Sequence, residues 1–152
     1  MFKKYSQEPF IIAEVGQNHN GDFDIAKKYI EVFSNSGANA VKFLTRDNKY
    51  LFAEEAYTKE YNSENAYAET YGAHREKLEL SKSEITELAL ICKKSKVFFM
   101  STPFDEPSLD FLLSINVDIL KIASFDLGNL PLIDKIGKSK KPVVISIGGG
   151  NS

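Results

Sequence analysis

Phe10-Ile-Ile-Ala-Glu-Val-Gly-Gln-Asn-His-Asn-Gly21 is the part of the sequence that says most about the fold. Its first part, Phe10–Gly16, is too short and too rich in β-branched and aromatic side chains for a helix, so it predicts a strand. Buried parallel strands are continuous apolar runs of this kind, because helices cover the sheet. The turn that follows lacks the G-x-G-x-x-G pattern of dinucleotide-binding folds.

Four more apolar runs of this kind predict four further strands: Asn39–Thr45, Val97–Pro103, Ile119–Phe125 and Pro142–Gly148. Helical sequence separates the runs. Asp22 or Asp24 is a candidate N-cap for the first helix, and Ser81 with Glu84 forms a capping-box pattern before a later one. A strand and a helix therefore repeat four times before a final strand, which indicates a parallel sheet with right-handed crossovers.

Two architectures fit this order of elements. A doubly wound sheet is complete with about five strands, whereas a (β/α)8 barrel typically needs about 250 residues. The absence of a dinucleotide-type turn favours the barrel, and Ser146–Ser152 is a strand-to-loop transition, a poor place for a domain to finish. We predict an α/β fold of the (β/α)8 TIM-barrel type, truncated to five parallel strands in sequential order, with residues 1–152 as one partial domain.

The composition is that of a globular protein without a basic surface. The chain has 152 residues, 43% of them hydrophobic and 26% charged, with a net charge of -2. This excludes the basic footprint of a nucleic-acid-binding protein, and no apolar run reaches the roughly 18 residues of a membrane span. The N-terminus has no signal-peptide pattern, and the single cysteine, Cys92, is expected in a helix core. We expect a cytoplasmic protein.

Residues 46–80 differ from the rest of the chain. They are rich in Tyr, Glu, Asn and Lys and have no long apolar stripe. An excursion of this length after a strand is unusual in a compact domain, and it is often a functional loop or lid.

Charged residues lie near the C-terminal ends of three predicted strands. They are Glu14, Lys42 and Lys121. In a parallel sheet that closes into a barrel, these side chains converge on one mouth, where β/α enzymes build active sites. Because an unpaired buried carboxylate costs several kcal/mol, Glu14 should have a cationic partner or a ligand. The cluster is either an anion-binding or proton-transfer site or a structural ion pair.

The two histidines allow two interpretations. His19 could act as a general acid or base or as a metal ligand, but a histidine in an Asn/Gly turn is also a common hydrogen-bonding loop residue. His74 is a weaker candidate of the same kind. The spacings of established metal sites are absent from the sequence, and Gly148–Gly150 could cradle phosphate through its amides.

Four motifs together resemble the N-terminal half of the barrel domain of the sialic acid (N-acetylneuraminate) synthase family: residues 12–21, 40–43, 101–104 and 121–124. The resemblance implies a TIM barrel that is usually followed by an antifreeze-like domain. It implies condensation of phosphoenolpyruvate with an N-acetylated amino sugar, such as N-acetylmannosamine, to give a nonulosonic acid and phosphate. It also implies a divalent metal, Mn²⁺ or Mg²⁺.

The resemblance also implies roles for individual residues. The phosphoenolpyruvate carboxylate and phosphate would be held by Lys42, Thr102, Lys121 and Ser124, with Ser146 near the phosphate. Glu14 would be the catalytic residue, facing the sugar acceptor or its activated water. The chain departs from the family at Leu44, where the family usually has Gln, and at Ser146-Ile-Gly-Gly149, where it usually has Ser-Thr-Gly-Met.

The resemblance further implies that the second half of the barrel, its metal-binding histidines and the antifreeze-like domain are missing from this chain. The metal ligands are therefore not expected within it. Uncovered inner-face residues, expected at Ile11, Ala13, Phe99 and Ile122, and unpaired strand edges predict a homo-oligomer or a marginally stable chain without synthase activity of its own.

Two alternatives to the synthase remain at this point. One is a Schiff-base aldolase with Lys121 or Lys42 as the nucleophile. The other is a non-catalytic truncated or split chain that needs a partner half.

Overall fold

The computed structural model describes residues 8–150, and its centre is one parallel sheet of five strands in the order β1-β2-β3-β4-β5. The strands are β1 (Ile12–Gly16), β2 (Ala40–Thr45), β3 (Phe98–Pro103), β4 (Ile119–Ile122) and β5 (Val143–Ile145). Each strand pairs in parallel with the next one along the chain. The sequential order confirms the barrel-type α/β fold and excludes a doubly wound sheet, whose strand order reverses direction.

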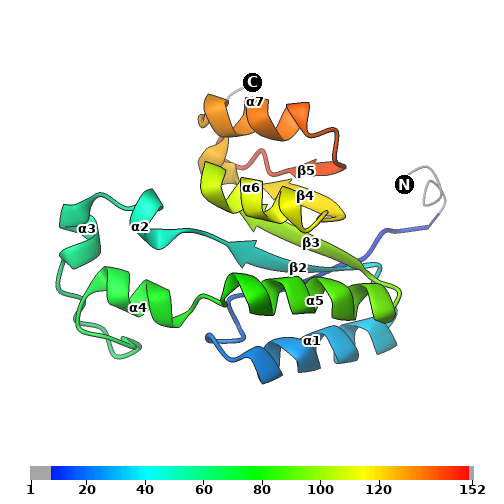
Figure 1. Cartoon of the computed structure of the whole chain (residues 1–152), viewed down its shortest axis with the longest axis horizontal. Coiled ribbons are helices and arrows are strands. Elements are labelled where there is room, and N and C mark those ends of the chain that lie inside the picture. Colours follow the sequence, from blue (N-terminus) through cyan, green and yellow to red (C-terminus); the bar gives the residue numbers. More distant parts are fainter. Residues whose placement is uncertain (1–7, 151–152) are drawn as a thin grey trace.

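The longer helices all cover the same face of the sheet (Figure 1). They are α1 (Phe23–Asn35), α5 (Lys82–Lys94), α6 (Glu106–Ser114) and α7 (Leu130–Lys138). A short 3₁₀ helix, η2 (Ser124–Asp126), follows β4. Within residues 8–150, no helix has the length and apolar content needed to cross a membrane.

Side-chain hydrogen bonds fix where the helices begin. Asp22 caps α1, Asp105 caps α6 and Asn129 caps α7, each by accepting from a backbone N–H in the first turn. At α5 the expected capping box is present: Ser81 Oγ accepts from the N–H of Glu84, whose carboxylate accepts from the N–H of Ser81. These contacts satisfy N–H groups that have no partner inside the helix.

The sheet has one covered face and one open face. Under the helices, the main core includes Phe43, Phe99, Leu120 and Ile122, and Phe43 stacks on Phe99 with ring centroids 5.7 Å apart. A smaller cluster, built on Ala40, Met100 and Ile119, occupies the opposite, inner face. Cys92 is in the main core, where burial raises its pKa to about 12 and leaves the thiol protonated at neutral pH.

The expected inner-face placement of Phe99 and Ile122 was wrong. Phe99 and Ile122 are 1% and 2% exposed and pack in the main core under the helices. Side chains alternate between faces along a strand, so a one-residue error assigns a whole strand to the wrong side. The apolar inner face is instead formed by the neighbouring residues Met100 and Ile119, together with Ala40.

The excursion at residues 46–80 is folded. It contains three short helices, α2 (Asn48–Leu51), α3 (Glu54–Thr58) and α4 (Tyr71–Lys77), beyond the C-terminal end of β2 (Figure 1). Glycines at its contacts have no room for a side chain: a Cβ at Gly72 would lie 2.4 Å from the Tyr57 ring, and one at Gly21 would lie 2.1 Å from the Lys77 carbonyl oxygen. The excursion is therefore packed closely against the turn between β1 and α1.

Candidate active site

Glu14 and Lys42 are opposite each other on β1 and β2, at the C-terminal half of the inner face. Lys42 Nζ lies 2.5 Å from Glu14 Oε2, so the cationic partner that the sequence predicted for Glu14 is present. The Lys42 side chain is 11% exposed, whereas that of Glu14 is 50% exposed. Glu14 is thus less buried than its apolar strand suggested, and its carboxylate is open to an incoming molecule.

Lys42 extends this contact to a third strand. Its Nζ donates a hydrogen bond of 3.3 Å to Oγ1 of Thr102, which is buried at the end of β3. One ammonium group therefore joins a carboxylate on β1 to a hydroxyl on β3.

Lys121 forms a second polar centre between β4 and the end of β5. Its Nζ donates to Ser146 Oγ at 2.6 Å and to the carbonyl oxygen of Ile122 at 2.9 Å. Burial lowers the pKa of Lys121, the nearby positive charge of Lys42 lowers it further, and Glu14 opposes both. Two ammonium groups close enough to affect each other attract an anion more strongly than either does alone.

Ser124 is exposed at the start of η2. A Cβ at Gly148, just beyond β5, would lie 3.9 Å from the Ser124 Cβ, so Ser124 is beside the loop that follows Ser146. In the described part of the chain, no hydrogen bond joins the Ser124 side chain to the residues above. We call the six residues the mouth cluster: Glu14, Lys42, Thr102, Lys121, Ser124 and Ser146. Hydrogen bonds and the ion pair connect five of them in two groups, and their roles stay a prediction.

Both histidines are integrated into the packing. His19 is 3% exposed, its Nδ1 accepts from the N–H of Gly21 at 3.0 Å, and burial lowers its pKa. His74 Nδ1 accepts from the N–H of Tyr67 at 3.2 Å. These contacts favour the structural interpretation of both residues. Within residues 8–150, no group of three or more His, Cys, Asp or Glu side chains is arranged to hold a metal ion.

The structure adds a polar network that the sequence analysis missed. Gln17, directly after β1, donates to Glu79 at 2.9 Å and accepts from Arg75 at 3.0 Å. Arg46, directly after β2, has its guanidinium carbon 4.4 Å from the centroid of the Phe104 ring. The only signal in the sequence is that Gln17 and Arg46 are polar residues placed directly after strands.

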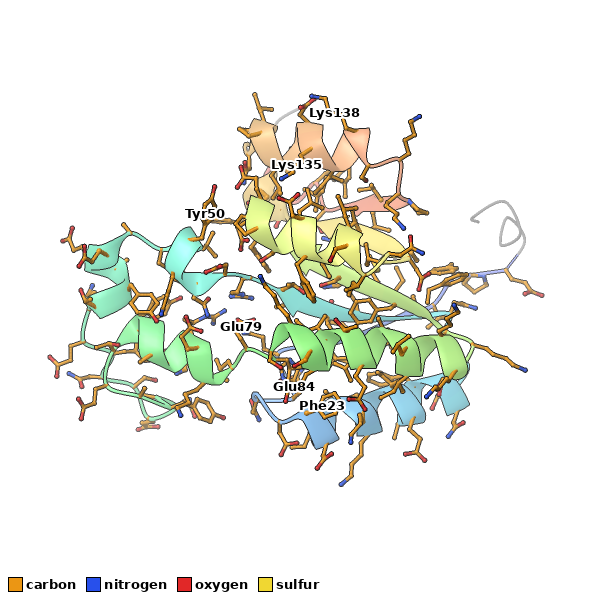
Figure 2. The ribbon with its side chains drawn as sticks, in the orientation of Figure 1. Phe23, Tyr50, Glu79, Glu84, Lys135 and Lys138 are labelled. Atoms are coloured by element: carbon orange, nitrogen blue, oxygen red, sulfur yellow. The ribbon has the colours of Figure 1, made fainter. Side chains whose placement is uncertain are left out.

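Glu79, whose side chain is labelled in Figure 2, has the most strongly shifted carboxyl pKa in the described part of the chain. Burial raises its pKa from 4.5 to about 8, although the positive charge of Arg75 opposes this. The folded state therefore binds a proton more tightly than the unfolded state. Its stabilising effect is complete below pH 4.5 and is lost as pH rises through about 8.

We expect the free energy of unfolding to fall between pH 5 and 8, with a contribution from Glu79 on the order of 1 kcal/mol per pH unit. Glu79→Gln mimics the protonated group and should flatten this slope. Glu31→Gln, an exposed carboxyl group on α1, should leave it unchanged. Urea unfolding at several pH values measures the slope, and an identical slope in wild type and Glu79→Gln would contradict the assignment.

The sequence is similar to one family model and to synthases from several organisms. The sequence model of the NeuB family matches residues 29–152. The chain is 42% identical over 139 residues to the N-acetylneuraminate-9-phosphate synthase of Drosophila melanogaster, a match covering 91% of this chain and 37% of that protein. It is 40% identical over 146 residues to the N,N'-diacetyllegionaminic acid synthase of Campylobacter jejuni, covering 95% of this chain and 44% of that protein.

Solved structures agree with the sequence relatives. The N-acetylneuraminic acid (sialic acid) synthetase of Leptospira borgpetersenii, solved in complex with citrate, superposes with a TM-score of 0.79 at 33% identity, over 94% of this chain and 46% of that one. A truncated 3-deoxy-D-arabino-heptulosonate 7-phosphate synthase of Thermotoga maritima, 17% identical with a TM-score of 0.62, shares the fold. This chain spans less than half the length of each of the relatives named here. By its sequence match over most of its length, the chain belongs to the NeuB family.

Proposed function

We propose that this chain forms the first part of a synthase that condenses phosphoenolpyruvate with an N-acetylated amino sugar to give a nonulosonic acid and phosphate. One observation carries the proposal: Lys42 and Lys121 lie on the same end of the inner face, each hydrogen-bonded to a hydroxyl group. Phosphoenolpyruvate carries a carboxylate and a phosphate, so it needs two cationic groups at a short separation. Lysine suits phosphate as a compact point charge.

We propose that each of the two polar centres binds a different anionic group of the substrate. Lys42 with Thr102, and Lys121 with Ser146 and Ser124, would hold the two anionic groups of phosphoenolpyruvate. Charge-assisted hydrogen bonds of this type are shorter and stronger than neutral ones. They would fix the enol carbon relative to the aldehyde carbon of the sugar, where the new C–C bond forms.

Glu14 is suited to the acceptor side of the reaction. Its carboxylate is half exposed, while its ion pair with Lys42 fixes its position. A carboxylate held in this way accepts hydrogen bonds from sugar hydroxyls or from a water molecule that adds to the reacting carbon. We propose that Glu14 orients the amino sugar or this water next to the bound phosphoenolpyruvate.

We further propose that residues 1–152 are the first four strand–helix units and the fifth strand of a (β/α)8 barrel. The inner face around Ala40, Met100 and Ile119 supports this, because in a closed barrel the remaining strands cover such residues. Strands β1 and β5 have one open edge each in the described sheet, which supports self-association of the isolated chain into a homo-oligomer. A reduced, buried Cys92 is compatible with a cytoplasmic location, which we also propose.

We propose that the complete synthase uses a divalent metal, Mn²⁺ or Mg²⁺. Residues 8–150 offer no group of metal-binding side chains, and His19 and His74 are engaged in the packing. We therefore assign the metal no ligand in this part of the chain and no step of the reaction.

The proposal is tested by release of inorganic phosphate. A polypeptide that contains this chain and the rest of the barrel should release phosphate from phosphoenolpyruvate only when N-acetylmannosamine or a related hexosamine and Mn²⁺ are present. Reactions without the sugar are the control. No release with any N-acetylated hexosamine would refute the synthase assignment.

The Schiff-base alternative makes a different prediction, and the named relatives do not favour it. An aldolase would form an imine between pyruvate and Lys121 or Lys42, and borohydride would convert it to a stable adduct. We expect no mass increase after treatment with pyruvate and borohydride.

A further inference from the structure

A cavity of about 320 Å³ lies between the connection from β2 to α2 and the first turns of α5 and α6. Thr45, which lines it, hydrogen-bonds Ser101 at 2.8 Å and is on the same face of β2 as Phe43 of the main core. Lys42 is on the other face, because side chains alternate along a strand. The cavity is therefore separate from the mouth cluster.

Asn48 is the first sign that this cavity holds a ligand. Asn48 lines the cavity and is 2% exposed, and neither its Nδ2 nor its Oδ1 has a hydrogen-bond partner among the described residues. An unpaired buried polar group costs about 1–3 kcal/mol, so such groups are normally matched by a water, an ion or a ligand. Arg46 Nε lies 3.2 Å from Glu79 Oε1 but makes no hydrogen bond to it, so its N–H is also available.

The cavity favours a negatively charged ligand. Cationic side chains line it from two elements: Arg46 and Lys49 after β2, and Lys82 in the first turn of α5. Three carboxylates line it as well, Asp47, Glu76 and Glu79, and with Glu79 protonated the lining carries one positive charge in excess. Burial favours the protonated form of Glu79 at neutral pH.

Helix α5 adds to this attraction. Ser81 and Lys82, at its N-terminus, both line the cavity, and the N-terminal end of a helix carries partial positive charge. Lys82 Nζ lies 5.7 Å from the centroid of the Phe111 ring, which also lines the cavity. The ammonium group therefore lies at the exposed edge of the cavity.

We propose that this cavity binds a phosphate group, either as inorganic phosphate or as part of a small phosphate ester. Phosphate oxygens accept hydrogen bonds from the Asn48 amide, the Arg46 guanidinium and the Lys82 ammonium, so one ligand satisfies the unpaired donors. The cavity volume is in the range of sites for small molecules. A phosphate bound here joins the end of β2, the strand that carries Lys42, to the start of α5.

The test is an NMR titration of the ¹⁵N-labelled chain with sodium phosphate at constant ionic strength, repeated with glucose 6-phosphate. We expect saturable shifts of the backbone amides of residues 46–49 and 81–83 and of the Asn48 side-chain amide. Saturation by both compounds identifies a site for a phosphate group, and saturation by inorganic phosphate alone identifies a site for the free anion. Lys121→Gln removes one cation of the mouth cluster and should leave these shifts in place.

Matched variants complete the test. Lys82→Gln should weaken phosphate binding about two- to fivefold, the effect of losing one solvent-exposed charge from the site. Lys94→Gln, in the last turn of the same helix, should leave the affinity unchanged. Asn48→Leu should abolish the shifts. If that variant does not fold, the comparison of Lys82→Gln with Lys94→Gln is the deciding measurement. Equal affinities of Lys82→Gln and Lys94→Gln, or shifts confined to the surroundings of Lys42 and Lys121, would overturn the proposal.

Discussion

Replacing Lys121 by alanine in a polypeptide with the complete barrel should raise the KM for phosphoenolpyruvate about 10- to 100-fold, because a charge-assisted hydrogen bond is worth about 1.5–3 kcal/mol. Lys121 Nζ is held by Ser146 and by the carbonyl oxygen of Ile122, so its charge has a fixed position at the mouth. Alanine removes the charge and leaves Ser146 without its donor. Steady-state kinetics with phosphoenolpyruvate as the varied substrate measures the effect.

Lys138→Ala is the matched control for this experiment. Lys138 is an exposed lysine on α7 whose ion pair with Asp134 is on the protein surface. Its removal should change neither KM nor kcat, because exposed ion pairs contribute little. If Lys121→Ala has the same KM and kcat as wild type, the proposed phosphoenolpyruvate site is wrong.

The largest expected effect on stability comes from helix α5. Leu88→Ala should lower the free energy of unfolding by about 2–5 kcal/mol, because truncating a fully buried leucine leaves a cavity in the core. Leu88 is 0% exposed, whereas Leu90 on the same helix is 54% exposed. Leu90→Ala has the same chemistry and the same helix propensity change, so it isolates the contribution of burial.

Urea unfolding of both variants, followed by circular dichroism, provides the measurement. We expect a small change for Leu90→Ala, within the range of ordinary surface substitutions. A loss of stability as large as that of Leu88→Ala would mean that the outer surface of α5 is buried in a contact with another chain or segment.

The order of the elements could be predicted from the sequence, but the ends of the last strands could not. The alternation of apolar runs and helical segments is a local signal, and it was sufficient for five parallel strands in sequence order. Strand β4 ends at Ile122, earlier than predicted, because residues Ser124–Asp126 form a 3₁₀ helix. Strand β5 is limited to Val143–Ile145, since pairing with β4 and not apolar character determines its length.

The candidate site was partly predictable for a similar reason. Glu14, Lys42 and Lys121 are near strand ends, so topology alone brings them to one edge of the sheet. The contacts of Gln17 and Arg46 with Glu79 are different, because Glu79 is at the end of a long excursion whose path has no periodic signal. The cavity beside Asn48 depends on the same path.

The close contact between Gly21 and the backbone of Lys77 also bears on how this protein can be engineered. Exchanging residues 46–80 for the corresponding segment of a relative is an obvious way to alter the surroundings of the mouth. The transplanted backbone must then fit against a turn that accepts only glycine at this position. A chimera that also takes the turn at residues 17–22 from the same donor keeps both sides of the contact matched, and we recommend this pair of segments as the unit of exchange.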